Sequence, residues 1–288
     1  MLWRELSSEQ NKRMLLAVIG DPIAHSKSPV MHNAALEALG IEGEYFPVHV
    51  SPEDLGSAIS RFKELGFRGI NVTIPHKVDV MKYLDQIDDS AARIGAVNTI
   101  VNENGILTGY NTDGIGYVRS LKDETHVDLR GKSILVLGAG GAARGIISAL
   151  AQEDPKTLVI ANRTEDKAIQ MAEEWKSVVN ISAITIDKVS DILADMDVVI
   201  NTTSIGMHPS TSHTPIDPEL IPAGIIVSDL IYNPLTTEIL KKSHERGCTI
   251  HGGLGMFVNQ GAYALEYWTG MPAPIETMRT AVLKSLQN

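Results

Sequence analysis

Cysteine is nearly absent from this 288-residue sequence, which contains only Cys248. One cysteine cannot form an internal disulfide framework, and its place in the segment CTIH is typical of a small hydrophobic residue in a strand. Positive charge is also scarce, because 25 Lys and Arg face 35 Asp and Glu, for a net charge of -10. Proteins that bind nucleic-acid phosphates concentrate positive charge, so we expect no nucleic-acid partner.

Long apolar runs are missing as well. No stretch reaches the length that spans a membrane, and the start, MLWRELSSEQNKR, lacks the apolar core of a signal peptide. We interpret this start as a short extra helix or a frayed arm of a cytoplasmic protein. The histidines show no metal-binding spacing such as HExxH, so we predict no metal site.

The remaining composition, 43% hydrophobic and 21% charged residues, is typical of a globular protein. Strand-like and helix-like segments alternate along nearly the whole chain, which predicts an α/β fold. Residues 15–20 are predicted to form a strand, and the following helix has Ser28 as its cap and Pro29 at its first position. Asn104-Gly105 between two strand-like arms indicates a tight hairpin, so the sheet of this half is predicted to be mixed.

From about residue 128 the alternation becomes regular. The strand-like segments SILVLG, TLVIAN, ISAITI, DVVINT, IIVSDL and CTIHG indicate a doubly wound, Rossmann-like sheet. The tail is helical and must bury an apolar face. We therefore predict a substrate domain over residues 1–115, a dinucleotide-binding domain over 116–251, and C-terminal helices over 252–288 that return to the first domain.

A glycine-rich loop follows the strand SILVLG and opens a helix. It has the pattern Gly138-x-Gly140-x-x-Ala143, and its place between strand and helix separates a dinucleotide loop from a chance match. Glycines allow a tight turn and a close approach of backbone N–H groups to a pyrophosphate, which the helix N-terminus also attracts. The alternative is a glycine-rich turn without a ligand.

The end of the next strand distinguishes between the two nicotinamide dinucleotides. An NAD site usually has an acidic residue there, which accepts hydrogen bonds from the ribose 2′-hydroxyl. This sequence has Asn162-Arg163-Thr164 instead, followed by Lys167 one helical turn later. Two cations and a hydroxyl suit a 2′-phosphate, so NADP is the predicted cofactor. Thr164 is also placed to cap a helix, which is compatible with phosphate binding.

Three polar residues lie at or near predicted strand ends, where open α/β sheets bind their ligands: Lys77 in NVTIPHK, Asn98 in GAVNTI and Asp113 in YNTDG. A positively charged lysine can donate a proton while a carbonyl is reduced, which makes Lys77 a candidate catalytic residue. Each residue also has a structural alternative. Lys77 can be a solvated strand end, Asn98 can satisfy backbone groups in a bend, and Asp113 can cap a helix.

The sequence resembles the shikimate dehydrogenase family over nearly its whole length. The stretches that carry the resemblance occur in family order, and they are GDPIAHSKSPVMHN, NVTIPHK, GAVNTI, YNTDG, GAGGAARG, NRT, NTTSIGM, DLIYNP and GGLGMFVNQGA. The resemblance implies an α/β substrate domain joined to an NADP-binding domain, and the reversible, NADPH-dependent reduction of 3-dehydroshikimate to shikimate. This reaction belongs to aromatic amino-acid (chorismate) biosynthesis.

The resemblance also implies roles for individual residues. It makes Lys77 and Asp113 the catalytic pair. The residues that it implies for substrate binding are Ser26, Ser28, Thr73, Lys77, Asn98, Asp113, Tyr232 and Gln260. Those that it implies for cofactor binding are Gly138, Ala139, Gly140, Gly141, Ala142, Asn162, Arg163, Thr164, Lys167, Leu230 and Gly253, together with Asp89.

Physical reasoning supports part of this assignment. Ser26 and Ser28 flank the predicted start of a helix, whose free N–H groups and dipole favour an anion such as a carboxylate. The alternatives are a plain cap for Ser28 and a loop hydroxyl for Ser26. His76 receives no role, because neighbouring residues of an extended segment point to opposite sides. Met256 is left open between a nicotinamide contact and a core side chain.

Two rival functions fit the same residues. A quinate/shikimate dehydrogenase that uses NAD is disfavoured by Ser26 and Ser28 and by the lack of an acidic residue at 162–164. A non-catalytic sensor of shikimate-like ligands is disfavoured by the presence of Lys77 and Asp113, and by the lack of a DNA-binding module or basic arm. Lys167 stands where some relatives have arginine, which weakens bidentate recognition of a phosphate. A homodimer is left open.

Overall fold

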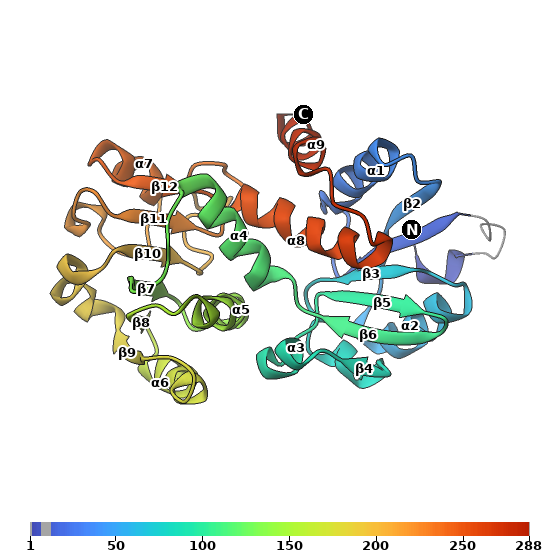
Figure 1. The fold of residues 1–288 in the computed structure, drawn as a ribbon, viewed down its shortest axis with the longest axis horizontal. Coiled ribbons are helices and arrows are strands. Elements are labelled where there is room, and N and C mark those ends of the chain that lie inside the picture. The colour runs from blue at the N-terminus through green and yellow to red at the C-terminus, as the bar shows by residue number, and fades with distance from the viewer. Residues whose placement is uncertain (1, 7–12, 288) are drawn as a thin grey trace. The chain divides into compact units, whose positions relative to one another are not determined.

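The computed structural model describes residues 2–6 and 13–287, which belong to two compact units (Figure 1). The first unit contains the chain up to Thr112 together with Gln260–Asn288, and the second contains Asp113–Asn259. The sequence analysis places these divisions near residues 116 and 252, several residues away from those of the structure. Both units combine helices with strands, so the predicted α/β class is confirmed.

The sheet of the first unit has six strands in the order β2-β1-β3-β5-β6-β4. Their bounds are β1 (Met14–Gly20), β2 (Gly43–His49), β3 (Gly69–Val72), β4 (Gln86–Ile87), β5 (Thr99–Glu103) and β6 (Ile106–Tyr110). β1 pairs in parallel with β2 and β3, whereas β5 pairs antiparallel with β3 and β6, which confirms the mixed sheet. β4 has only two residues, which is too short for a periodic pattern to predict.

The predicted hairpin joins β5 to β6 and is confirmed. Asn104 and Gly105 form its turn with φ of 53° and 87°, both in the left-handed region. Such a turn matches the right-handed twist of the two strands, and Asn-Gly tolerates it best. Thr99 is paired with Tyr110, so residues 98 and 111 lie at the same end of the hairpin.

Helices cover the sheet of the first unit. They are α1 (Ser28–Ala38), α2 (Leu55–Glu64), α3 (Asp89–Ile94), α9 (Ile275–Gln287) and the part of α8 (Gly253–Thr269) that follows Asn259. Short 3-10 helices add η1 (Trp3–Glu5), η3 (Pro52–Asp54) and η4 (Asp79–Tyr83). η1 corresponds to the predicted N-terminal helix or arm, and the remainder of that prediction, residues 7–12, lies outside the described residues.

The start of α1 differs from the prediction. Ser28 is the first residue of the helix, and Lys27 stands at the cap position without a capping side chain. Pro29 is therefore the second helical residue, where its missing N–H still costs no hydrogen bond. The expectation that Ser28 caps the helix is wrong.

The second unit has a six-stranded sheet in the order β12-β11-β10-β7-β8-β9, and every strand pair is parallel. The bounds are β7 (Ser133–Leu137), β8 (Thr157–Asn162), β9 (Ile181–Thr185), β10 (Val198–Asn201), β11 (Ile226–Asp229) and β12 (Thr249–His251). The chain runs outward in both directions from the β7/β10 pair. Open doubly wound sheets bind dinucleotides at such a reversal point, beyond the carboxyl ends of the strands.

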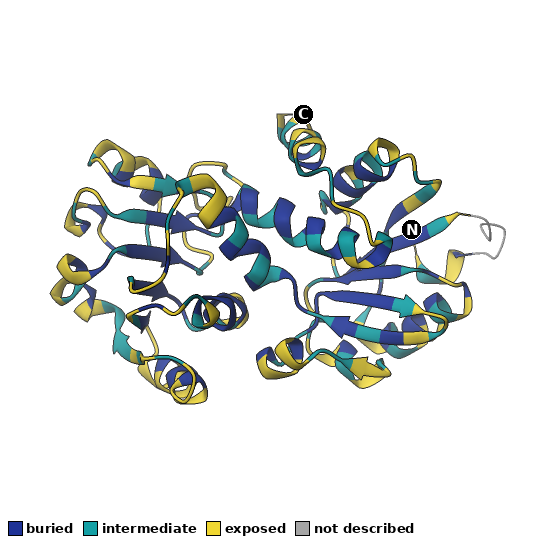
Figure 2. Ribbon diagram, viewed as in Figure 1, coloured by how far each residue is buried: buried dark blue, intermediate teal, exposed yellow. Residues whose placement is uncertain are grey.

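Helices pack on both faces of this second sheet. They are α4 (Asp113–Thr125), α5 (Gly141–Leu150), α6 (Glu165–Trp175) and α7 (Glu238–Glu245), with the 3-10 helices η5 (Ala151–Glu153), η6 (Ile186–Asp191), η7 (Leu193–Asp195) and η8 (Pro218–Leu220). Successive residues of β7 point into two separate cores, Ile134 into one and Leu135 into the other. The strands are accordingly buried while the outer faces of the helices are exposed (Figure 2).

Helix length and composition give no sign of a membrane segment. Across the described residues, no helix combines the length and the apolar character needed to cross a membrane.

Candidate active site

The first unit gathers several of the predicted substrate residues at the ends of its strands. The Val72 N–H donates to the Asn98 carbonyl at 2.8 Å, and the Val97 N–H donates to the Lys77 carbonyl at 2.8 Å. Thr73 follows Val72 directly in the chain. These backbone bonds therefore hold the segments of Thr73, Lys77 and Asn98 next to one another at the end of β3.

His76, the neighbour of Lys77 in the chain, is directed into the interior. His76 is buried, and its Nε2 lies 2.7 Å from the Val50 carbonyl, so this nitrogen donates its proton into the interior. The contact agrees with leaving His76 out of the site. Among the described residues, no group of three or more His, Cys, Asp and Glu side chains is placed to hold a metal ion.

The two predicted carboxylate-binding serines lie at the start of α1. The Ser28 N–H donates to the Ser26 Oγ at 3.3 Å, which fixes the loop before the helix. Ser28 is buried at the first position of α1, and Tyr45 on β2 is buried as well. Burial raises the pKa of Tyr45 well above its usual value, so this hydroxyl stays protonated.

Tyr45 is hydrogen-bonded to a second buried residue. Its hydroxyl donates to the Asn71 Oδ1 at 2.7 Å. The Asn71 Nδ2 in turn donates to the Asn98 carbonyl at 3.2 Å and to the Thr99 Oγ1 at 3.1 Å. A polar chain therefore runs from β2 across β3 to β5.

Asn98 closes this chain. Its Oδ1 accepts hydrogen bonds from the Thr99 hydroxyl at 2.9 Å and the Thr112 N–H at 2.8 Å, and its Nδ2 donates to the Thr112 Oγ1 at 3.0 Å. Asn98 is 3% exposed, while Thr99 and Thr112 are fully buried. The expected role of Asn98 in a bend is partly correct, because the side chain does satisfy a backbone group, but it also orders a larger network.

Four members of this network were not singled out by the sequence analysis: Tyr45, Asn71, Thr99 and Thr112. Asn71 carries a detectable signal, since it is an amide inside an otherwise apolar strand segment and buried polar groups need partners. The others have no such signal, because their partners are far away in the sequence.

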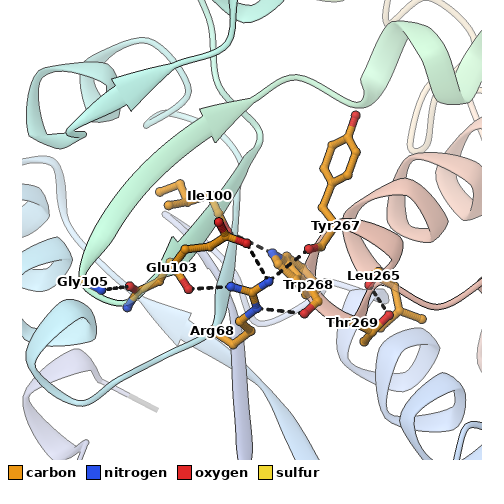
Figure 3. A network of polar contacts seen from close by, with 9 residues as sticks. Arg68, Ile100, Glu103, Gly105, Leu265, Tyr267, Trp268 and Thr269 are labelled. Atoms are coloured by element: carbon orange, nitrogen blue, oxygen red, sulfur yellow. Dashed lines mark hydrogen bonds and ion pairs between the residues drawn. The ribbon is translucent and has the colours of Figure 1, made fainter.

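The second part of α8 is anchored to the first unit by Arg68 (Figure 3). The Arg68 Nε donates to the Trp268 carbonyl and its Nη1 donates to the Asn102 carbonyl, both at 2.8 Å. The Trp268 Nε1 donates to the Ile100 carbonyl at 3.0 Å. These bonds fix the helix that carries Gln260. The next residue, Gly261, is so close to α1 that an added Cβ would lie 2.2 Å from the Met31 side chain.

In the second unit, the glycine loop lies between β7 and α5, as predicted. Gly138 has φ of 108°, and an added Cβ would lie 2.7 Å from the Thr202 Oγ1, so only glycine fits. An added Cβ at Gly140 or Gly141 would meet no atom within 4 Å, and neither residue is covered by a capping side chain. The first N–H groups of α5 are therefore accessible to an anion.

The cationic segment after β8 is exposed. Asn162 shapes it, because its Nδ2 donates to the Thr164 carbonyl at 2.8 Å. Arg163, Thr164 and Lys167 are all exposed. Thr164 stands at the cap position of α6, as predicted, but its side chain makes no capping hydrogen bond. Glu165 occupies the first turn of α6, beyond the 162–164 segment.

Leu230 and Gly253 are brought together. An added Cβ at Gly253 would lie 2.1 Å from the Leu230 carbonyl, so the start of α8 depends on a glycine there. The loop after β11 is held by the buried Asp229, which accepts bonds from the Ile231 N–H at 3.0 Å and the Thr237 hydroxyl at 2.7 Å. Burial raises the pKa of Asp229, although these donors oppose the shift. The sequence analysis did not single out Asp229.

The remaining predicted residues are divided between the units. Asp113 is the half-buried first residue of α4 and directly follows Thr112 in the chain. Tyr232 stacks on Phe257 with ring centroids 4.8 Å apart, and burial raises the pKa of its hydroxyl. Asp113 and Tyr232 belong to the second unit, whereas Lys77 and Asn98 belong to the first.

Asp89 belongs to the first unit, whereas the other predicted cofactor residues belong to the second. It is exposed at the start of α3 in the first unit, next to Asp88, whose side chain caps the helix. Met256 is partly buried and packs against a core of the second unit.

The fold and the glycine loop define a dinucleotide-binding α/β protein with a second α/β unit. Family models match three parts of the chain: a shikimate dehydrogenase substrate binding domain at residues 18–100, a shikimate/quinate 5-dehydrogenase domain at 120–211, and a shikimate 5′-dehydrogenase C-terminal domain at 253–283. The chain therefore belongs to the shikimate dehydrogenase family, as the resemblance indicates.

Individual relatives are similar along their whole length. A Bacillus cereus protein named shikimate dehydrogenase (NADP(+)) is 48% identical over 274 residues, which cover 95% of this chain and 99% of the relative. A shikimate dehydrogenase solved in complex with NADP+ is 41% identical, with a TM-score of 0.90 over 96% of this chain and 97% of that one. The Listeria monocytogenes shikimate 5-dehydrogenase, solved with shikimate and NAD, is 35% identical, with a TM-score of 0.88 over 96% of both chains.

Proposed function

We propose that this protein catalyses the reversible, NADPH-dependent reduction of 3-dehydroshikimate to shikimate, a step of aromatic amino-acid (chorismate) biosynthesis. It is an oxidoreductase of the shikimate dehydrogenase family, and its cofactor is NADP. The observation that carries the proposal is the family match over both units, which coincides with a glycine loop, a cationic strand end and a buried polar site.

The second unit fits the proposed cofactor. Gly140 and Gly141 leave the start of α5 open for a pyrophosphate. Arg163 and Lys167 are exposed cations at the place where a 2′-phosphate is recognised, and we assign that role to them together with Asn162 and Thr164. Bound NADPH supplies the hydride. The rest of the chemistry falls to side chains of the chain itself.

The first unit is proposed to bind the substrate. We assign Ser26 and Ser28 to the carboxylate, and Thr73, Asn98 and Gln260 to the ring hydroxyls. From the second unit, Tyr232 is assigned to substrate binding, and Leu230 and Gly253 to the cofactor. A site of buried, mutually hydrogen-bonded groups rejects analogues that lack a matching hydroxyl, because its own polar groups are then left unpaired.

Lys77 is proposed to move the proton. During reduction it donates a proton to the carbonyl oxygen while the carbonyl carbon accepts the hydride, and in the reverse direction it takes the hydroxyl proton back. Asp113 is proposed as the second catalytic residue. Asp89 remains a candidate cofactor contact from the resemblance alone.

The setting of the reaction is also proposed. Cys248 is a buried single cysteine whose Sγ lies 3.3 Å from the Pro222 carbonyl, which suits a reducing cytoplasm. The partners are expected to be small molecules, with no nucleic acid, because the net charge is -10. Light scattering during size-exclusion chromatography tests whether the protein forms a homodimer.

The decisive experiment follows NADPH consumption with 3-dehydroshikimate by the wild type and by Lys77→Ala. The wild type is expected to be active, and Lys77→Ala is expected to lose about 10²–10⁴ in kcat, the typical contribution of a positioned acid or base. Lys82→Ala is the matched control, because Lys82 is an exposed lysine of the neighbouring η4 that pairs with Asp79. Its kcat is expected to stay within about twofold of the wild type.

Two results contradict the proposal. A wild type that binds shikimate but does not consume NADPH indicates a sensor, and a Lys77→Ala variant that changes only KM makes Lys77 a binding residue. Quinate with NAD serves as the rival substrate pair. Faster turnover with that pair than with 3-dehydroshikimate and NADPH identifies a quinate dehydrogenase.

A further inference from the structure

Tyr45 is unusually well fixed for a residue outside the assigned site. Its ring, 2% exposed, stacks on His32 with centroids 4.4 Å apart and planes 8° from parallel, and Trp268 lies at 6.2 Å. Asn33 clamps its backbone, because the Tyr45 N–H donates to the Asn33 Oδ1 at 2.8 Å and the Asn33 Nδ2 donates to the Tyr45 carbonyl at 3.0 Å. Residues 32 and 33 of α1, the helix that begins at Ser28, thus hold Tyr45 in place.

The direction of the hydrogen bonds around Tyr45 follows from a backbone group. The Asn98 carbonyl can only accept, so the side-chain atom of Asn71 that faces it at 3.2 Å is the amide nitrogen. The Asn71 oxygen therefore faces Tyr45 and accepts the single proton of the Tyr45 hydroxyl.

The same reasoning extends to the far end of the chain. The Asn71 amide donates to the Thr99 hydroxyl, and Thr99 then donates to the Asn98 Oδ1, which also accepts the Thr112 N–H. Every bond in the chain points in one direction, from Tyr45 to Asn98. The orientation of each side chain is consequently determined by the next one.

We propose that Tyr45 is a positioning residue for substrate binding, which holds the hydroxyl-binding Asn98 in place through Asn71. The inference rests on the proposed function, since it concerns the substrate that Asn98 binds. The chain reaches the Asn98 backbone carbonyl through Asn71 and the Asn98 side-chain oxygen through Thr99.

Replacing Tyr45 with phenylalanine removes the first link. The Asn71 oxygen then lacks a donor in a buried position, and the amide is free to rotate away from Thr99 and Asn98. We expect KM for 3-dehydroshikimate to rise about tenfold, the effect of one hydrogen bond. We expect kcat and KM for NADPH to stay within about twofold, since the ring still fills its place between His32 and Trp268.

Tyr117→Phe is the matched control. Tyr117 is also fully buried and donates one bond, to the Ser228 Oγ at 2.9 Å, but it belongs to the second unit. It is expected to lower the melting temperature as much as Tyr45→Phe does while leaving KM for 3-dehydroshikimate unchanged. A Tyr45→Phe variant that is destabilised but has the wild-type KM shows a purely structural hydroxyl and overturns the inference.

A double-variant cycle tests the link itself. If Tyr45 and Asn98 act through one chain, the Tyr45→Phe/Asn98→Ala variant raises KM by less than the product of the two single effects. A full product means independent action and overturns the inference while the proposed function stands. A wild type that consumes no NADPH with 3-dehydroshikimate refutes the proposed function, and the inference falls with it.

Discussion

The two units build their candidate sites from different materials. In the first unit, Asn98 is fixed by hydrogen bonds with Thr99 and Thr112, and Ser28, Asn98 and Thr112 are at most 8% exposed. In the second unit, the glycine loop presents backbone N–H groups, and the cations Arg163 and Lys167 stand exposed on the surface. The candidate substrate site of the first unit is therefore built from buried side chains, whereas the candidate cofactor site of the second unit is built from exposed groups beyond the ends of its strands.

This difference matches the ligands that are proposed for the two units. A small polyhydroxylated acid is distinguished by the positions of its oxygens, which calls for donors and acceptors fixed in a buried network. A dinucleotide has charged phosphates, which a helix N-terminus and exposed cations attract. This attraction does not require a buried network of fixed side chains. Mutations in the first site should therefore affect stability and binding together, while mutations in the second should separate them.

Among the changes that test this difference between the units, Asn98→Ala is expected to have the largest effect on stability and on KM together. The change leaves the Thr112 N–H and the Thr99 hydroxyl without their acceptor in a buried place, and each unsatisfied group costs about 1–3 kcal/mol. Urea denaturation is expected to show a loss of about 3 kcal/mol. KM for 3-dehydroshikimate should rise at least about tenfold in the same variant.

Asn180→Ala provides the comparison for Asn98→Ala. Asn180 is exposed, and its Nδ2 donates to the Lys156 carbonyl at 3.0 Å. This variant should keep both the wild-type KM and, within about 1 kcal/mol, the wild-type stability. An Asn98→Ala protein with raised KM but unchanged unfolding would break the proposed contrast between the units.

The same contrast explains what was predictable from the sequence. The glycine loop, the Asn104-Gly105 hairpin and the regular strands of the second unit were predictable because each depends on residues close together in the chain. The network of Tyr45, Asn71 and Thr112 was not, because Tyr45 and Asn71 are 26 residues apart and only the sheet order brings them together.

Ser28 shows how a local rule fails. Its place before Pro29 satisfies the usual pattern of a helix cap, yet the helix begins at Ser28 itself, and Lys27 stands at the cap position without a capping side chain. The sequence therefore indicated candidate substrate residues but not the hydrogen-bonded network around Asn98.

A second prediction uses pH to test the buried character of the first unit. His32 is fully buried, and no hydrogen-bond partner reaches either ring nitrogen among the described residues. Burial lowers its pKa from 6.5 to about 3. Because the folded state disfavours protonation of His32, the contribution of this residue to stability is fully present above pH 6.5. It is lost as pH falls from there toward about 3.

The expected size follows from the linkage of protonation to folding. Between pH 7 and pH 5, His32 should account for a loss of roughly 2 kcal/mol in the free energy of unfolding. His32→Phe keeps an aromatic ring against Tyr45 but cannot be protonated, so its unfolding should depend less on pH over this range. Equal pH dependence of the two proteins would show that His32 is hydrated or paired, contrary to a tightly closed interior.

Arg163→Ala is expected to separate binding from stability in the second unit. Loss of a charge-assisted hydrogen bond to a 2′-phosphate should raise KM for NADPH about tenfold, with no change in KM for NADH, which lacks that phosphate. Unfolding should change by less than about 0.5 kcal/mol, because the side chain is exposed. Lys176→Ala, an exposed lysine just after α6, is the control. Equal losses with NADH and NADPH would mean that Arg163 does not contact the 2′-phosphate.

The smallest effect is a gain, expected for Lys167→Arg. A lysine contacts a phosphate as a point charge, whereas the planar guanidinium of arginine can form two parallel hydrogen bonds with it. The ratio of kcat/KM for NADPH over NADH should rise about threefold, less than one further neutral hydrogen bond can give, because an exposed side chain loses freedom when it is ordered. The substitution leaves the first unit untouched, so KM for 3-dehydroshikimate should not change. A drop in the ratio would show that Lys167 is held in a geometry that arginine cannot adopt, and the second site would then depend on fixed side chains as much as the first.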